Sequence, residues 1–114
     1  MMKIITFLKI QEILQNNMDT INLENQFNKA LRLLDFGKIE KGEVILDEII
    51  IKAQKEENML FFIRASCVLG ELLFLNGKIE EARRHLLNVV NTAYENDVVE
   101  YEKSVASDLL NRLG

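Results

Sequence analysis

The side chains most often found in catalytic and metal sites are scarce in this sequence, which has one cysteine, Cys67, and one histidine, His85. A zinc-type site needs several ligands at close spacing, and no such cluster of His, Cys, Asp and Glu surrounds either residue. Cys67 has no neighbouring base, and a free cysteine most often behaves as a small buried hydrophobe. His85 follows Arg83-Arg84 and is expected to be a solvent-facing or partly buried helix residue. The sequence therefore predicts no catalytic residue, metal or cofactor, and we interpret the chain as not an enzyme.

Phosphate and nucleic-acid chemistry are also disfavoured. The pairs Gly37-Lys38 and Gly77-Lys78 lack the surrounding pattern of a phosphate-binding loop. The 14 basic residues are scattered against 18 acidic ones, which gives a formal net charge of −4. Nucleic-acid binding needs a concentrated basic face, because phosphate contacts supply most of its affinity. We expect no nucleic-acid partner.

The sequence also favours a cytoplasmic protein without a membrane partner. No stretch approaches the roughly 20 apolar residues of a membrane-spanning helix. Lys9 interrupts the apolar run after Lys3, and no small-residue cleavage site of a signal peptide follows. A single cysteine excludes an intrachain disulfide, which fits a reducing compartment.

An internal repeat organises the chain. Residues 37–40 read Gly-Lys-Ile-Glu, and the same four residues recur at 77–80, an offset of 40. Similar residues pair at this offset elsewhere: Leu33 with Leu73, Leu46 with Leu86, Ala53 with Ala93, Ala30 with Gly70, and Gly42 with Ala82. A fixed period in this range is typical of repeat proteins whose units stack in one direction.

The segments between these markers have helical periodicity. In 58–76 and 79–95 apolar residues recur every three or four positions. Gly37 and Gly77 are placed where helices commonly end. The β-branched run 44–51 would also suit a buried strand, but its partner 40 residues later has a helical composition, so we expect a helix. The sequence predicts about six helices, at 2–16, 20–36, 39–57, 58–76, 78–96 and 98–113. Without proline or low-complexity linkers they form one domain, 1–114, with neighbours antiparallel.

Residues 23–113 resemble the tetratricopeptide repeat in a long-period variant. One copy contains Leu69-Gly70, Gly77, Ile79, Ala82, Leu86 and Val90, and the other contains Ala30, Leu33, Gly37, Ile39, Gly42, Leu46 and Ile50. The small residues stand where paired helices approach most closely. The sequence departs from the family by lacking proline and by its period of 40 instead of about 34. The resemblance implies an all-α, antiparallel helix-pair solenoid.

The resemblance also implies a concave peptide-binding groove lined by the first helix of each pair. The inward positions are Glu24, Phe27, Leu31 and Leu34 on one helix and Arg64, Cys67, Glu71 and Phe74 on the next. These residues do not resemble the Lys/Asn/Arg clamp by which some members of the family bind a carboxylate. Apolar stripes at helical spacing are often core, so a groove and a core remain alternatives for these positions.

The interpretation is a protein-binding module, an adaptor or small chaperone that holds an apolar or amphipathic peptide or helix. The alternative is a structural, self-associating repeat protein with no separate ligand. Both terminal helices are broadly apolar and lack a packing partner in the repeat pattern, which predicts a homodimer through one of them. Their apolar residues are Ile4, Ile5, Phe7, Leu8, Ile10, Ile13 and Leu14 at one end, and Val98, Val99, Tyr101, Val105, Leu109, Leu110 and Leu113 at the other.

Overall fold

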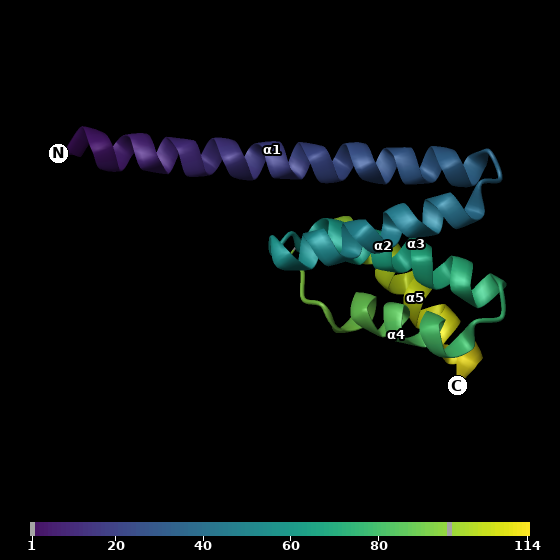
Figure 1. Ribbon diagram of the computed structural model, residues 1–114. Coiled ribbons are helices and arrows are strands. Elements are labelled where there is room, and N and C mark those ends of the chain that lie inside the picture. Colours follow the sequence, from purple (N-terminus) through teal and green to yellow (C-terminus); the bar gives the residue numbers. More distant parts are fainter. Residues whose placement is uncertain (1, 96) are drawn as a thin grey trace.

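The described part of the chain is all-helical, as the sequence predicted. A computed structural model describes the backbone of residues 2–95 and 97–114, and the side chains of residues 8–95 and 97–114. The elements are α1 (Met2–Asp35), α2 (Ile39–Lys55), α3 (Met59–Leu75), α4 (Ile79–Asn91), the 3-10 helix η1 (Asp97–Val99) and α5 (Glu100–Leu113) (Figure 1). The run 44–51 lies within α2, so its interpretation as a helix is confirmed.

The connections α1–α2, α2–α3 and α3–α4 are the same turn, repeated every 20 residues. Each has one residue at positive φ: Gly37 at 77°, Glu57 at 58° and Gly77 at 78°. In the last of them the Gly77 amide donates to the Phe74 carbonyl at 3.1 Å and the Lys78 amide to the Leu73 carbonyl at 2.9 Å, and the other two turns have the matching bonds. This Schellman pattern satisfies the last carbonyls of a helix and reverses the chain. The backbone therefore repeats helix by helix, at half the period of the sequence.

Of the three turn residues at positive φ, Glu57 is the one that is not a glycine. Its backbone is therefore expected to be strained. Left-handed φ costs an L-residue roughly 1–2 kcal/mol, and glycine relieves it at some cost in unfolded-state entropy. We predict that Glu57→Gly raises the free energy of unfolding by about 0.5–1 kcal/mol. Urea denaturation measures this change in the free energy of unfolding. The matched control is Glu56→Gly, because Glu56 has φ of −88° and should lose stability. A lower midpoint for Glu57→Gly would contradict the strain.

The two helices expected at 2–16 and 20–36 are one continuous helix, α1, so the prediction of a break and of six helices was wrong. The segment contains Asn16, Asn17 and Asp19, which are poor helix formers, but it has no glycine or proline to end the helix. With 34 residues, α1 is about 51 Å long, against about 25 Å for the 17 residues of α2. Its N-terminal half therefore projects beyond the other helices (Figure 1).

α4 ends earlier than the sequence predicted, at Asn91 instead of near residue 96. Thr92 adopts an extended conformation, with φ −90° and ψ 120°. Its hydroxyl donates to the Asn88 carbonyl at 2.5 Å, and its own carbonyl accepts from Lys103 Nζ at 2.7 Å. These bonds hold the chain as it leaves α4 and tie it to α5.

α3 is the central helix. Consecutive helices pack against one another, and α3 contacts α1, α2, α4, α5 and η1. Contacts between helices two apart join α1 to α3 and α3 to α5, while the described residues give none between α2 and α4. α1, α3 and α5 therefore approach one another on one side of the fold. The largest fully buried side chains among the described residues are Leu23, Leu46, Ile49, Ile63, Ser66, Leu86, Val89 and Val99.

Two glycines allow the closest helix contacts, at positions where the sequence predicted small residues. A β-carbon on Gly42 would lie 2.6 Å from Leu34 Cδ2, and one on Gly70 would lie 2.7 Å from Leu86 Cδ2. The facing leucine fills the space that a side chain would otherwise occupy, so each pair of helices meets at these points.

The last helix is not an unpartnered end, which corrects the expectation from the repeat pattern. Val99, Ala106 and Leu109 are buried, and other apolar side chains of α5 pack on the core from its edge. α5 lies against α3 and α4. Of the first helix, the side chains of Ile4, Ile5 and Phe7 lie outside the described residues, whereas those from Leu8 to Leu14 are exposed.

Candidate binding groove

A cavity of about 320 Å³ lies between α1, α3 and α5, and we call it the groove. It brings together five of the eight residues predicted from the sequence: Glu24, Phe27, Arg64, Cys67 and Glu71. Five further residues complete its lining: Asn28, Phe61, Val68, Tyr101 and Glu102. Three helices that are far apart in the sequence thus contribute to one site.

The other three predicted residues do not line the groove. Leu34 and Phe74 pack against the edge of the hydrophobic core, and Leu34 covers Gly42. Leu31 is half-buried outside the groove lining. The core alternative is therefore correct for Leu34 and Phe74. Leu34 lies on the same side of α1 as Phe27 but two turns further along, where it meets Gly42 of α2.

Aromatic rings form one wall of the groove. Phe27 of α1 and Phe61 of α3 meet edge to face, with ring centroids 5.9 Å apart and planes at 65°. The Arg64 guanidinium lies 6.0 Å from the Phe61 centroid. The sequence reasoning missed Phe61, although it belongs to the same helical face as Arg64, Val68 and Glu71. Tyr101 of α5 adds a ring that is 75% exposed, and so accessible to a ligand.

The side chains that line the groove carry more negative than positive charge. Arg64 Nε lies 3.5 Å from Glu102 Oε2, and both side chains are mostly buried. The sequence reasoning had expected Arg64 to share its face with Glu71, but its ion-pair partner comes from α5. Glu24 and Glu71 are exposed, and the described residues offer neither of them an ion pair. The rim therefore carries unpaired negative charge beside an apolar wall.

Comparisons of this chain with protein-family models, with curated proteins and with solved structures found no match. In the described part of the chain, none of the helices combines the length and the apolarity that crossing a membrane requires. Evidence on function therefore comes from the groove and from the exposed surfaces.

Cys67 forms part of the groove wall, and its thiol is weakly reactive there. It is buried, and its Sγ lies 3.7 Å from the Glu102 carbonyl, to which it donates. Burial, together with the nearby charges of Glu71 and Glu102, raises the pKa of the thiol from 9.0 to about 12. The thiol is therefore protonated at neutral pH, and a protonated thiol is a weak nucleophile and a weak metal ligand.

His85 is buried in the structure, whereas the sequence predicts a solvent-facing or partly buried helix residue. Its Cβ lies beside Gly70 of α3, and its Nδ1 finds no hydrogen-bond partner among the described residues. Burial lowers the pKa of His85, and Arg84 lowers it further, while Asp47 and Glu81 oppose the shift. The described residues contain no group of three or more His, Cys, Asp or Glu arranged to hold a metal ion. His85 is a buried residue of α4 that does not line the groove.

A larger cavity, of about 650 Å³, lies where α1 leaves the bundle. Its walls include Asp19 and Thr20 of α1, the α2–α3 turn and the end of α4. Asn58 anchors it, because its Nδ2 lies 3.4 Å from Thr20 Oγ1 and its Oδ1 accepts from the Phe61 amide at 3.3 Å. The bond to the Phe61 amide caps α3, and the bond to Thr20 links this cap to α1.

Proposed function

We propose that this chain is a protein-interaction module of the tetratricopeptide-like kind, an adaptor or small chaperone, which binds a basic amphipathic peptide or helix. The observation that carries the proposal is the groove itself, an aromatic wall with an acidic rim shared by α1, α3 and α5. An amphipathic segment laid in such a groove buries its apolar side and leaves its polar side at the rim.

The solenoid reading rests on the backbone repeat. The identical turns at Gly37, Glu57 and Gly77 give successive helices the same reversal. The contacts of α3 with α1 and α5, on one side of the fold, favour a concave face formed by alternate helices. Both features are typical of helix-pair repeats, in which each unit contacts its neighbours along one direction.

The chemistry of the groove selects the ligand. Aromatic anchors usually carry a large share of binding energy, and Phe27 and Tyr101 are the rings within reach of a ligand. The unpaired carboxylates of Glu24 and Glu71 favour a peptide with Lys or Arg at one edge, and such charges contribute more to specificity and on-rate than to affinity. We place this module in the cytoplasm, as the sequence suggested.

A selection from a library of random displayed peptides tests the proposal. We expect enrichment of amphipathic sequences with Lys or Arg beside apolar residues at helical spacing. Calorimetry with the enriched peptide should show that Tyr101→Ala and Glu71→Lys each weaken binding roughly tenfold or more, with unchanged thermal midpoints. The control is Val44→Ala, an exposed apolar position on α2 outside the groove, which should bind normally. Equal loss in all three variants, or no enrichment, would contradict the proposed site.

A second candidate is a self-associating structural protein, and one observation favours it. The projecting half of α1 exposes several large apolar side chains to solvent. A homodimer formed through this end is compatible with peptide binding, because the groove lies on the body of the fold.

A further inference from the structure

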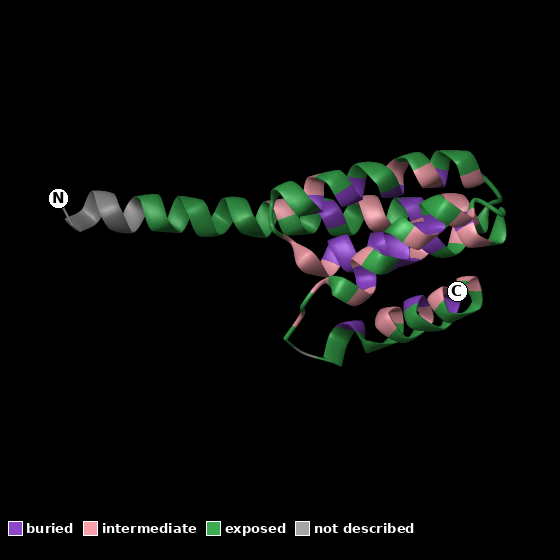
Figure 2. Ribbon diagram, turned by 90° about the horizontal axis from the view of Figure 1, so that it is seen from below, coloured by how far each residue is buried: buried purple, intermediate pink, exposed green. Residues whose placement is uncertain are grey.

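The projecting part of α1, residues 8–22, is an apolar surface with no partner in the fold. We call this segment the extension. Its six large apolar side chains are each 49–60% exposed: Leu8, Ile10, Ile13, Leu14, Met18 and Ile21. Leu23 is the first buried side chain described in α1, and before it α1 meets the bundle through Asn16, Asp19 and Thr20, which border the cavity of about 650 Å³. The segment before Asn16 stands clear of the other helices (Figure 2). So much exposed apolar surface on one straight helix indicates a binding partner.

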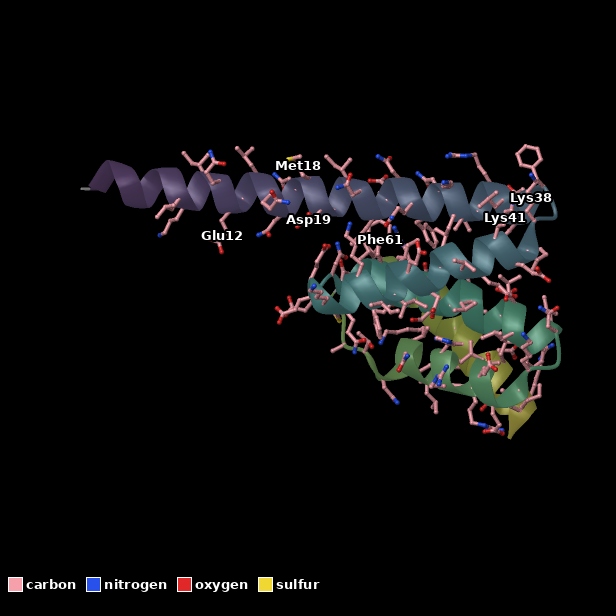
Figure 3. The ribbon with its side chains drawn as sticks, in the orientation of Figure 1. Glu12, Met18, Asp19, Lys38, Lys41 and Phe61 are labelled. Atoms are coloured by element: carbon pink, nitrogen blue, oxygen red, sulfur yellow. The ribbon has the colours of Figure 1, made fainter. Side chains whose placement is uncertain are left out.

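The extension has two distinct sides. At about 100° per residue, the side chains that pack on the bundle, such as Leu23, Phe27 and Leu34, share one side of α1. Four of the apolar residues of the extension fall on the opposite side, and we call them the outer stripe: Ile10, Leu14, Met18 and Ile21. Figure 3 shows Met18 pointing away from the bundle, while Glu12 and Asp19 point toward the bundle side. The stripe is thus turned outward, away from the groove.

The charges of the extension avoid the outer stripe. Its charged residues, Lys9, Glu12 and Asp19, all fall on the half of the helix that faces the bundle side. The residues beside the stripe are uncharged amides: Gln11, Gln15, Asn17 and Asn22. A surface of this kind can meet a copy of itself without bringing like charges together.

The distribution of charge along the chain indicates which kind of partner the outer stripe binds. Residues 1–22 hold two basic and two acidic residues, whereas residues 23–114 hold 12 basic and 16 acidic ones, so the body carries the whole net charge of −4. Helices that lie on membrane surfaces are usually rich in Lys and Arg. A neutral stripe flanked by amides does not match that pattern, but it matches a second neutral stripe.

The spacing of the stripe is the same in both directions. Ile10 and Met18 each lie four residues from Leu14, one on either side of it, so these three positions of the stripe are symmetric about Leu14. A two-fold interface requires a self-complementary patch, in which residue i meets residue j and j meets i. We propose that two copies of the chain pair antiparallel through their outer stripes, with the two-fold axis at Leu14 and Ile10 of each copy opposite Met18 of the other.

The antiparallel direction follows from the position of the bodies. Each stripe ends at Ile21, and the body begins at Leu23. Antiparallel pairing about Leu14 brings residues 8–20 of the two copies together, sets the two −4 bodies at opposite ends, and opposes the two helix dipoles. A parallel pair would bring both acidic bodies to the same end. Both grooves stay open in the dimer, which would then be bivalent for its ligand.

This pairing deepens the second candidate function and does not depend on the groove, so it is tested without peptide. Light scattering between low and high micromolar concentration should show the mass rising from 13.2 kDa to twice that value. Leu14→Glu sets two carboxylates together at the axis and should stay monomeric throughout. Leu8→Glu is the matched control, because Leu8 is equally exposed but lies off the stripe, and it should still dimerise. Circular dichroism should give all three proteins the same helicity.

Cysteine crosslinking then fixes the direction in a Cys67→Ala background. Ile10→Cys should not crosslink to itself but should crosslink to Met18→Cys when the two variants are mixed, whereas self-crosslinking of Ile10→Cys would indicate a parallel pair. The proposal is overturned by that parallel result, by a wild-type monomer at high concentration, by equal loss of dimer in Leu8→Glu, or by a monomer that sediments with lipid vesicles instead of pairing.

Discussion

The Gly70→Leu variant is expected to unfold at a markedly lower denaturant concentration than the wild type, with a loss of about 3 kcal/mol in the free energy of unfolding. A β-carbon at this position would lie 2.7 Å from Leu86 Cδ2, 2.9 Å from Leu86 Cγ and 3.5 Å from His85 Cβ. Leu86 is fully buried, so it has no solvent space into which to move. The added side chain must therefore push α3 and α4 apart.

Gly77→Ala is the companion variant, because it alters a glycine that matters for its backbone and not for its space. Gly77 has φ of 78°, and a β-carbon there would have nothing within 4 Å. Its cost should be limited to the left-handed backbone, about 1 kcal/mol. Urea denaturation of both variants gives the comparison. If Gly77→Ala were the more damaging change, the close contact of α3 with α4 would not be where we place it.

The second large effect is expected for Phe74→Ala. Phe74 is half-buried and packs against the edge of the core, outside the groove. Truncating a buried phenylalanine costs roughly 3–5 kcal/mol, so this half-buried ring should cost about 2–3 kcal/mol. The thermal midpoint should fall accordingly, while affinity for a groove ligand, measured below the transition, should be retained.

The neighbouring residue provides the control for that variant. Leu75 follows Phe74 in α3 but is 72% exposed, so Leu75→Ala should change the thermal midpoint little. The pair separates burial from helix propensity, since both changes introduce alanine near the same helix end. A Phe74→Ala protein that kept its stability but lost peptide binding would return Phe74 to the groove, as the sequence pattern first suggested.

Much of the fold could be predicted because particular residue types mark the ends of helices. Gly37 and Gly77 mark two of the turns, and the structure has turns there. The third turn uses Glu57 in the same left-handed conformation, and nothing in a glutamate announces that conformation. The break expected near residues 17–19 came from extending the repeat, whereas the local sequence has no glycine or proline there and so continues as helix.

The candidate site could be predicted on two of its three sides. The positions implied by the repeat resemblance put Phe27 with Glu24, and Arg64 with Cys67 and Glu71, and these residues line the groove together, because residues on one helical face remain neighbours whatever the packing. The resemblance could not show that Tyr101 and Glu102 close the groove, since this depends on how α5 docks against α3. It also could not show that Leu34 turns into the contact at Gly42, because the rotation of a helix is set by the close packing of its neighbour.

α1 combines the two surfaces on which the proposals rest. In its C-terminal half, Glu24 and Phe27 face the groove, whereas Met18 points to the opposite side (Figure 3), which Leu14, four residues earlier, shares. One continuous helix can therefore join two modules and still leave each groove accessible. The absence of a break in α1 has this direct consequence for assembly, because a flexible joint near residue 18 would let the extension fold back.

The central claim is that the groove binds a basic amphipathic peptide, and a nuclear magnetic resonance titration tests it most directly. The isotope-labelled protein is titrated with a synthetic amphipathic peptide of leucine and lysine, and amide shifts are followed to saturation. We predict saturable changes in amide chemical shift, concentrated at Phe27, Arg64, Glu71 and Tyr101. The amide shifts of Phe74 and of the outer stripe should change little. Changes centred on the outer stripe, or shifts that never saturate, would contradict it.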